Sequence, residues 1–155
     1  YTEFNSKLTV GIEGQFAYFS WYGDEDETSP GGQINVTVDS KMRIIDFSQY
    51  LYGNFKGNYK LSKYTSEDAK ESAKKFIAKA CPEFYPDTVL VEQEYSVHRN
   101  FEPYEFKFVR YINDLPCYDN YINVVVNSSN GKVSSFEVNW IDYDKIYPSK
   151  TTLLT

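Results

Sequence analysis

Two glutamates near the middle of the chain have the spacing of a carboxylate pair that hydrolyses glycosidic bonds. Glu92 and Glu94 fall in a segment whose residues alternate as in a strand, so both side chains are expected on one face. Their carboxylates would lie about 6–7 Å apart, which overlaps the roughly 6.5–9.5 Å separation of an inverting glycosidase. Because every Glu-x-Glu strand meets this condition, we interpret the pair as a solvated strand face.

The single histidine, His98, limits metal and nucleophilic chemistry. One histidine does not build a multi-histidine zinc site, and the sequence has no HExxH, GxSxG or glycine-rich phosphate loop. A catalytic pair of Cys117 with His98 is conceivable, but Cys117 lacks the basic neighbours that activate a thiol nucleophile. We therefore predict no catalytic residue, no metal and no cofactor, interpret His98 as a solvated loop residue, and predict that the chain is not an enzyme.

An acidic run, Asp24–Glu27 followed by Thr28, offers oxygen ligands of the kind that Ca²⁺ prefers. It lacks the spaced D-x-D-x-D-G pattern of an EF-hand, and adjacent acids usually stay solvated. We interpret the run as a solvated loop, with calcium as the alternative.

The two cysteines, Cys81 and Cys117, are interpreted as small buried apolar residues, because free cysteine is usually buried and inert. A disulfide between them is the alternative. A reactive thiol is the weakest of the three interpretations.

Aromatic side chains offer a candidate binding surface. They make up 18% of the residues, and most of them are tyrosine, which carries a polar tip on a large ring. Aromatic residues and arginine are common in recognition surfaces, whereas core packing is the competing interpretation in a chain so rich in rings. The candidate surface residues are Trp21, Tyr22, Arg110, Tyr111 and Tyr118.

Charge and hydropathy exclude several classes of partner. The net charge is −6 over 155 residues, which argues against nucleic acid and anionic membranes, since both require basic patches. No apolar run approaches the roughly 18 residues of a transmembrane segment. The length suits one domain, and because the chain opens at Tyr1 in strand-like sequence, we expect a piece of a longer protein.

Two stretches of the chain, residues 15–50 and 105–139, resemble each other. Ile34–Asp39 aligns with Ile122–Asn127, and insertions fall where loops are expected. Such a repeat predicts one supersecondary unit used twice. Further aligned pairs are Phe16 with Phe106, Tyr18 with Phe108, Trp21 with Tyr111 and Phe47 with Phe136.

Alternating apolar residues predict strands on both sides of one helix. The helix is expected to be capped at its start by Thr65 or Ser66, with acids in its first turn, and to end at Pro82. Its narrow stripe of small residues predicts that it packs closely on a sheet: Ala69, Ala73, Phe76, Ile77 and Ala80. The strands are predicted at residues 8–12, 15–22, 33–39, 43–52, 88–95, 104–111, 121–127 and 132–140.

The second half resembles the PepSY-like units of the YcdB/YcdC repeat family. The resemblance is carried by Phe106-x-Phe108-x-Arg110-Tyr111-x-Asn113-x-x-Pro116, Ile122-Asn123-Val124-x-Val126-Asn127, Asn130-Gly131-Lys132-Val133 and Trp140. Asp114 stands where that turn usually has glycine, a departure confined to the turn. The fold class is therefore expected to be α+β, an antiparallel sheet with one main helix packed on a face, in PepSY-like (cystatin-like) repeat units.

The expected division is a first unit of strands at residues 1–62, a complete second unit at residues 63–148 and a tail at residues 149–155, together in one compact domain. The resemblance implies an extracellular or cell-surface location in Gram-positive bacteria, and it brings no catalytic residues. It implies a non-catalytic binding or regulatory module whose partner is a secreted protein such as a protease. The alternatives are binding of cell-wall glycan and a structural spacer.

Overall fold

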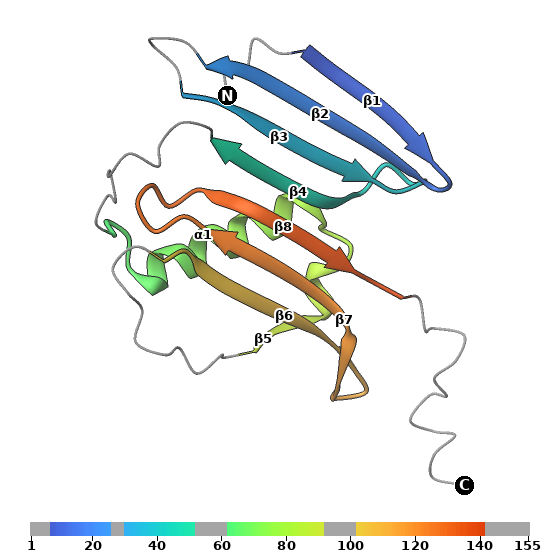
Figure 1. Ribbon diagram of the computed structural model, residues 1–155. Helices are drawn as coiled ribbons and strands as arrows, with labels where there is room; N and C mark the ends of the chain where they lie inside the picture. Colours follow the sequence, from blue (N-terminus) through green and yellow to red (C-terminus); the bar gives the residue numbers. More distant parts are fainter. Residues whose placement is uncertain (1–6, 26–29, 52–61, 92–101, 142–155) are drawn as a thin grey trace, which may run out of the picture.

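The computed structural model describes residues 7–25, 30–51, 62–91 and 102–141, and these form one antiparallel sheet with one α-helix (Figure 1). The eight strands lie in the order β1-β2-β3-β4-β8-β7-β6-β5. The sheet runs without interruption through both predicted repeat units. The strands are β1 Lys7–Glu13, β2 Phe16–Glu25, β3 Pro30–Val38, β4 Ile44–Leu51, β5 Thr88–Val91, β6 Tyr104–Ile112, β7 Leu115–Val126 and β8 Val133–Asn139. The predicted α+β architecture is confirmed.

The helix α1, Ser66–Ala80, begins and ends for reasons that are local to the sequence. Thr65 caps its start: the Thr65 hydroxyl accepts from the Asp68 N–H at 3.1 Å, and the Asp68 carboxylate accepts from the Thr65 N–H at 3.0 Å. This reciprocal capping box satisfies two backbone donors that the first turn leaves open. Pro82 follows the last turn and prevents continuation. A short 3₁₀ turn, η1 Tyr85–Asp87, then leads into β5.

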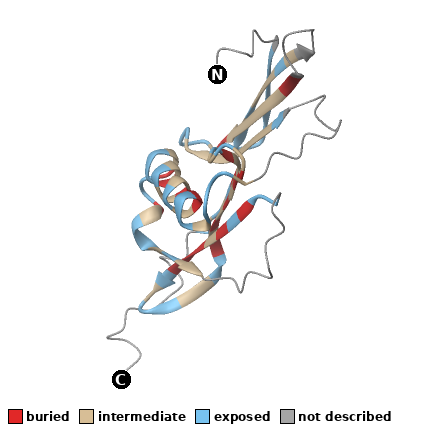
Figure 2. Cartoon of the chain, turned by 90° about the vertical axis from the view of Figure 1, so that its left-hand side faces the viewer, coloured by how far each residue is buried: buried red, intermediate tan, exposed pale blue. Residues whose placement is uncertain are grey.

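The core lies between α1 and one half of the sheet. Ala69, Ala73 and Ile77 are fully buried against the sheet, as their narrow stripe predicts. Figure 2 shows α1 over the strands of this half, while the β1–β3 end extends beyond the helix. The strand residues beneath α1 are Tyr104, Phe106, Phe108, Ile122, Val124, Val126, Val133 and Phe136.

A local two-fold relation joins the two halves at the β4–β8 pair. Phe47 lies opposite Phe136, which confirms that these two aligned residues occupy equivalent places. The neighbouring pairs are Asp46 with Glu137 and Ser48 with Ser135, so the register is the same when read from either strand. A two-fold axis through the phenylalanine pair therefore relates β1–β4 to β5–β8.

The strand registers correct one part of the predicted alignment. Phe19 lies opposite Val36, and Phe106 lies opposite Val124. Since Val36 and Val124 are equivalent, the counterpart of Phe106 is Phe19 and not Phe16. By the same shift the counterpart of Phe108 is Trp21, so the predicted pairs of Tyr18 with Phe108 and of Trp21 with Tyr111 are also wrong. A shift of three residues is odd, so it moves Phe16 to the other face of the sheet, where the side chain is 40% exposed.

The turns of the β3–β4 and β7–β8 hairpins differ by one residue in length, but each ends on a residue in the left-handed region. The Met42 N–H donates to the Asp39 carbonyl at 2.9 Å, and the Gly131 N–H donates to the Asn127 carbonyl at 2.8 Å. Met42 and Gly131 have φ of 62° and 67°. Glycine enters this left-handed region freely, whereas methionine pays a steric cost.

Candidate binding surface on the open face of the sheet

The side of the sheet that faces away from α1, here called the open face, is lined by polar side chains over six adjacent strands, β2 to β6 in the sheet order. Directly paired residues of an antiparallel sheet share a face, so the registers identify its members. They are Ser20, Gln33, Asn35, Thr37, Asp46, Ser48, Ser135, Glu137, Asn123, Glu105 and Lys107. These residues alternate with the apolar residues of the other face.

A hydrogen-bonded row crosses the first half of the open face. The Asn35 Oδ1 accepts from the Ser20 hydroxyl at 2.8 Å and from the Gln33 Nε2 at 2.7 Å. The Asn35 Nδ2 donates to the Ser48 Oγ at 3.3 Å. Residues of three strands are thus held in fixed orientations, which reduces the entropy lost when a partner binds.

Exposed tyrosines flank this row. Tyr22 and Tyr50 lie on either side of Gln33 in the sheet register and are 38% and 58% exposed. Tyr18 lies on the same face and is 38% exposed. Tyrosine contributes large contact area and a hydroxyl at little conformational cost, which suits a recognition surface.

The second half of the open face is charged. Asp46 and Glu137 lie directly opposite each other across the β4–β8 pair. Burial raises the pKa of the Asp46 carboxyl, and the negative charge of Glu137 raises it further. Glu137 also accepts from the Tyr121 hydroxyl at 3.4 Å, and the Lys107 ammonium lies 4.3 Å from the centre of the Tyr121 ring. Burial and the Glu137 charge raise the pKa of Tyr121.

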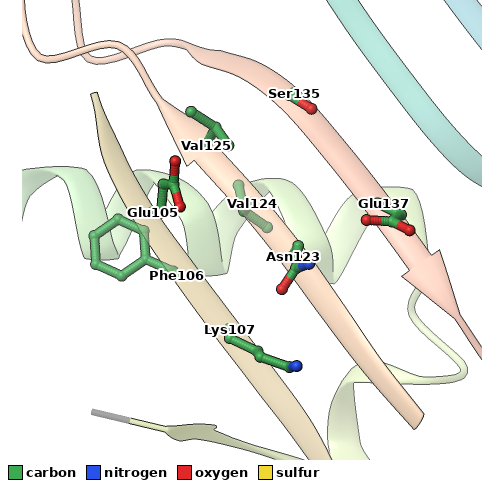
Figure 3. Close-up of a pocket in the computed structure, with 8 residues that line it drawn as sticks. All are labelled: Glu105, Phe106, Lys107, Asn123, Val124, Val125, Ser135 and Glu137. Atoms are coloured by element: carbon green, nitrogen blue, oxygen red, sulfur yellow. The ribbon is translucent and has the colours of Figure 1, made fainter. Parts of the chain in front are cut away.

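A hollow of about 310 Å³ lies over β6, β7 and β8 in this charged half. Figure 3 shows Glu105, Lys107, Asn123 and Glu137 projecting from adjacent strands, with α1 behind the sheet. The hollow is lined by two carboxylates and an amide, which offer acceptors, and by one ammonium, which offers donors. Such a set can hydrogen-bond a peptide or a sugar.

The structure does not bring the predicted aromatic surface together. Trp21 points to the α1 side, where it stacks on Phe19 at 6.1 Å, while its neighbour Tyr22 is on the open face. Tyr111 and Tyr118, 39% and 64% exposed, lie by the β6–β7 hairpin. Four strands separate β2 from β6, which corresponds to about 24 Å at the usual strand spacing.

Arg110 differs from the expectation because it is only 8% exposed and does not reach the surface. Its guanidinium lies 4.8 Å from the centre of the Trp140 ring, and Trp140 stacks on Phe84 at 4.5 Å. On the other side of this stack, the Arg43 guanidinium lies 4.6 Å from the Phe84 ring. Arg110 thus belongs to a cation–π stack that fixes the end of β8.

The structure describes the two cysteines, whereas several other candidate residues fall outside the described ranges. Both cysteines are free thiols, Cys81 buried and Cys117 partly exposed. Burial raises the pKa of Cys81 to about 12, so its thiol is protonated and inert at neutral pH. Glu92, Glu94, His98 and the acidic residues 26–27 lie outside the described residues.

The described residues contain neither a cluster of metal-ligating side chains nor a helix that could span a membrane. Within residues 7–25, 30–51, 62–91 and 102–141, no three His, Cys, Asp or Glu side chains gather as a metal site would require. In the same ranges no helix is long and apolar enough to cross a membrane.

Comparisons with known proteins agree with this architecture. Among solved structures, the Bacillus megaterium YpeB C-terminal domain superposes with a TM-score of 0.59 at 14% sequence identity. The match covers 94% of this chain and 59% of that one, so the present chain spans less than two thirds of its neighbour and shares its PepSY-like fold. No curated protein matches. The family model described as the YcdB, YcdC repeated domain matches residues 7–140, and the chain therefore belongs to the YcdB/YcdC repeated-domain family.

Proposed function

We propose that this domain is a non-catalytic binding module of a secreted or cell-envelope protein, and that its open face binds a protein partner. The observation that carries the proposal is the fixed polar row of Ser20, Asn35 and Ser48 with exposed tyrosines beside it. Amides and hydroxyls offer donors and acceptors to a partner, and tyrosines are enriched at the energetic centres of interfaces. Membership of a family of non-catalytic PepSY-like type agrees with binding as the activity.

The partner class that we propose is a secreted protease whose activity the domain regulates. The acidic character of the chain, with a net charge of −6, favours a basic partner surface and accelerates its association. A basic surface of the partner would be complementary in charge to the charged half of the open face, where Asp46 and Glu137 lie side by side.

A second candidate is cell-wall glycan, and the placement of Tyr22 and Tyr50 on either side of Gln33 favours it. The tyrosine rings offer apolar faces that can pack on a sugar ring, and an amide carries both a donor and an acceptor for its hydroxyls. Both candidate functions rely on these two tyrosines. An experiment therefore distinguishes them only when it offers both a protein partner and a glycan.

The test uses two matched double variants. Tyr22→Ser with Tyr50→Ser alters the open face, and Tyr111→Ser with Tyr118→Ser alters exposed tyrosines at the distant hairpin. Each immobilised domain is exposed to a Gram-positive secretome and to purified cell wall, and retained proteins are identified and titrated. Truncation of a central interface tyrosine costs more than about 1 kcal/mol, so two should weaken binding about 30-fold.

The proposal predicts that the native domain and the hairpin variant retain the same protein and that the open-face variant loses it. Inhibition of a retained protease by the domain would support the regulatory role. Retention of wall alone would assign the face to glycan. If all three forms of the domain retained the same protein equally, the open face would not be the binding surface. If none of them retained protein or wall, the domain would be a structural spacer.

A further inference from the structure

Half of the sheet exposes apolar side chains on the same side as α1. Val36 lies opposite Phe47, which packs against Phe76 of α1, so the residues in register with Val36 share the side of the helix. Leu8, Val10 and Ile12 of β1 belong to it and are 51%, 52% and 81% exposed. We call this set the uncovered apolar face: Leu8, Val10, Ile12, Phe19, Trp21, Ile34 and Val36.

Five of the seven members of the uncovered apolar face have an equivalent of matching type on the face that α1 covers. Through the two-fold relation, Ile34 and Val36 correspond to Ile122 and Val124, and the latter two are fully buried beneath the helix. The other equivalent pairs are Phe19 with Phe106, Trp21 with Phe108 and Leu8 with Leu90. Four of these five pairs have the same residue type, and the fifth exchanges one aromatic ring for another.

The two faces are also continuous. Phe76 of α1 contacts Phe136 at 5.3 Å between ring centres and reaches across the axis to Phe47 at 5.8 Å. Ile44 and Phe47 of the first half thus already border the core of the second. A second helix on the uncovered apolar face would extend this established helix–sheet interface rather than create a separate one.

We propose that the uncovered apolar face binds an amphipathic α-helix of the α1 type, supplied by another repeat unit of this family. The two-fold relation places that helix beside α1 on the same side of the sheet and antiparallel to it. Its stripe carries alanines four residues apart followed by a branched residue, as in Ala69, Ala73 and Ile77, because small residues allow close approach to equivalent strand positions. Equal residue types in the two faces are the reason for choosing a helix as occupant rather than a second sheet.

The test uses a peptide with the sequence of residues 64–82, added to the whole domain. The two tryptophans separate the faces in an NMR spectrum, because Trp21 lies in the uncovered apolar face and Trp140 stacks on Phe84. The proposal predicts a saturable shift of the Trp21 indole N–H signal and an unchanged Trp140 signal. Because an isolated peptide of this length is marginally helical, the same sequence is also fused to the N-terminus through a Gly/Ser linker, where a rise of several degrees in thermal midpoint is expected.

Adjacent residues of β1 provide the matched control. Val10→Asp places a charge in the uncovered apolar face and is expected to weaken the peptide at least tenfold, while Thr9→Asp, on the other side of the same strand, leaves affinity unchanged. Both sites are exposed, so both variants should fold. Three results would overturn the proposal. The first is an unshifted Trp21 signal with peptide together with an unchanged thermal midpoint of the fusion. The second is a shift of the Trp140 signal, which indicates that the peptide exchanges with α1, and the third is a dimer of the domain that Val10→Asp dissociates, which assigns the face to a second copy.

Discussion

The equivalent isoleucines Ile122 and Ile34 give the sharpest test of how this sheet is stabilised. Ile122 is fully buried beneath α1, while Ile34 is partly exposed on the uncovered apolar face. Replacing isoleucine with alanine removes three carbons, worth about 2.4 kcal/mol at roughly 0.8 kcal/mol for each buried carbon. Because α1 prevents collapse around the gap, a cavity cost is added, and Ile122→Ala should destabilise by about 3–4 kcal/mol. Ile34→Ala leaves a space that water can enter, so about 1 kcal/mol is expected.

Urea unfolding of the two variants, followed by circular dichroism, measures both free energies of unfolding. Tryptophan fluorescence adds a reporter in each half, Trp21 and Trp140. The expected difference of about 2–3 kcal/mol comes from the helix alone, since residue type and strand position are matched. Equal costs for the two substitutions would refute the conclusion that α1 covers only one of two equivalent faces.

Three further predictions concern single residues. Gly131→Ala should destabilise the fold by about 2–3 kcal/mol, because alanine is strained at a φ of 67° and its Cβ would lie 2.6 Å from the Tyr64 ring. In a Tyr64→Ala background the contact with the ring is absent, so urea unfolding should show only the backbone cost of about 1 kcal/mol. Met42→Gly should stabilise by about 0.5–1 kcal/mol, because Met42 has a left-handed φ of 62° and is 71% exposed; an unchanged urea midpoint would count against a strained turn. The folded-state pKa of Asp46 is raised, first by burial and then by Glu137, so ionised Asp46 weakens the fold above that pKa and the penalty disappears as pH falls through it. Asp46→Asn should therefore raise the free energy of unfolding at pH 7 and have little effect below the pKa of Asp46; a loss of stability at pH 7 would contradict the assignment.

Much of the fold follows from short-range patterns in the sequence. Alternation over Ile34–Val38 and Ile122–Val126 predicts both inner strands, and the capping residues of α1 predict its start. The alternation of apolar residues predicts that β7 starts at residue 121, whereas the strand begins at Leu115. It begins earlier because Asn113 and Asp114 both adopt left-handed conformations, at φ of 53° and 65°, in a two-residue hairpin turn that lacks the usual glycine signal.

The candidate binding surface was much less accessible from sequence. Asn35 and Ser48 are distant in the chain, and only the register of β3 with β4 places them side by side. Arginine is usually exposed, yet Arg110 is buried against the Trp140 ring, and no local sequence pattern predicts that contact. Trp21 and Tyr22 are adjacent in the sequence, but adjacent residues of a strand point to opposite faces and cannot share one surface.

The most direct test of the proposed function is an NMR titration of the isotope-labelled domain with the protein that it retains from the secretome. Side-chain amide signals of Gln33 and Asn35 report on the open face, and the indole signal of Trp21 reports on the α1 side. Our account predicts that the two amide signals shift on binding while the Trp21 signal stays in place. A shift of Trp21 with unchanged Gln33 and Asn35 signals would contradict it.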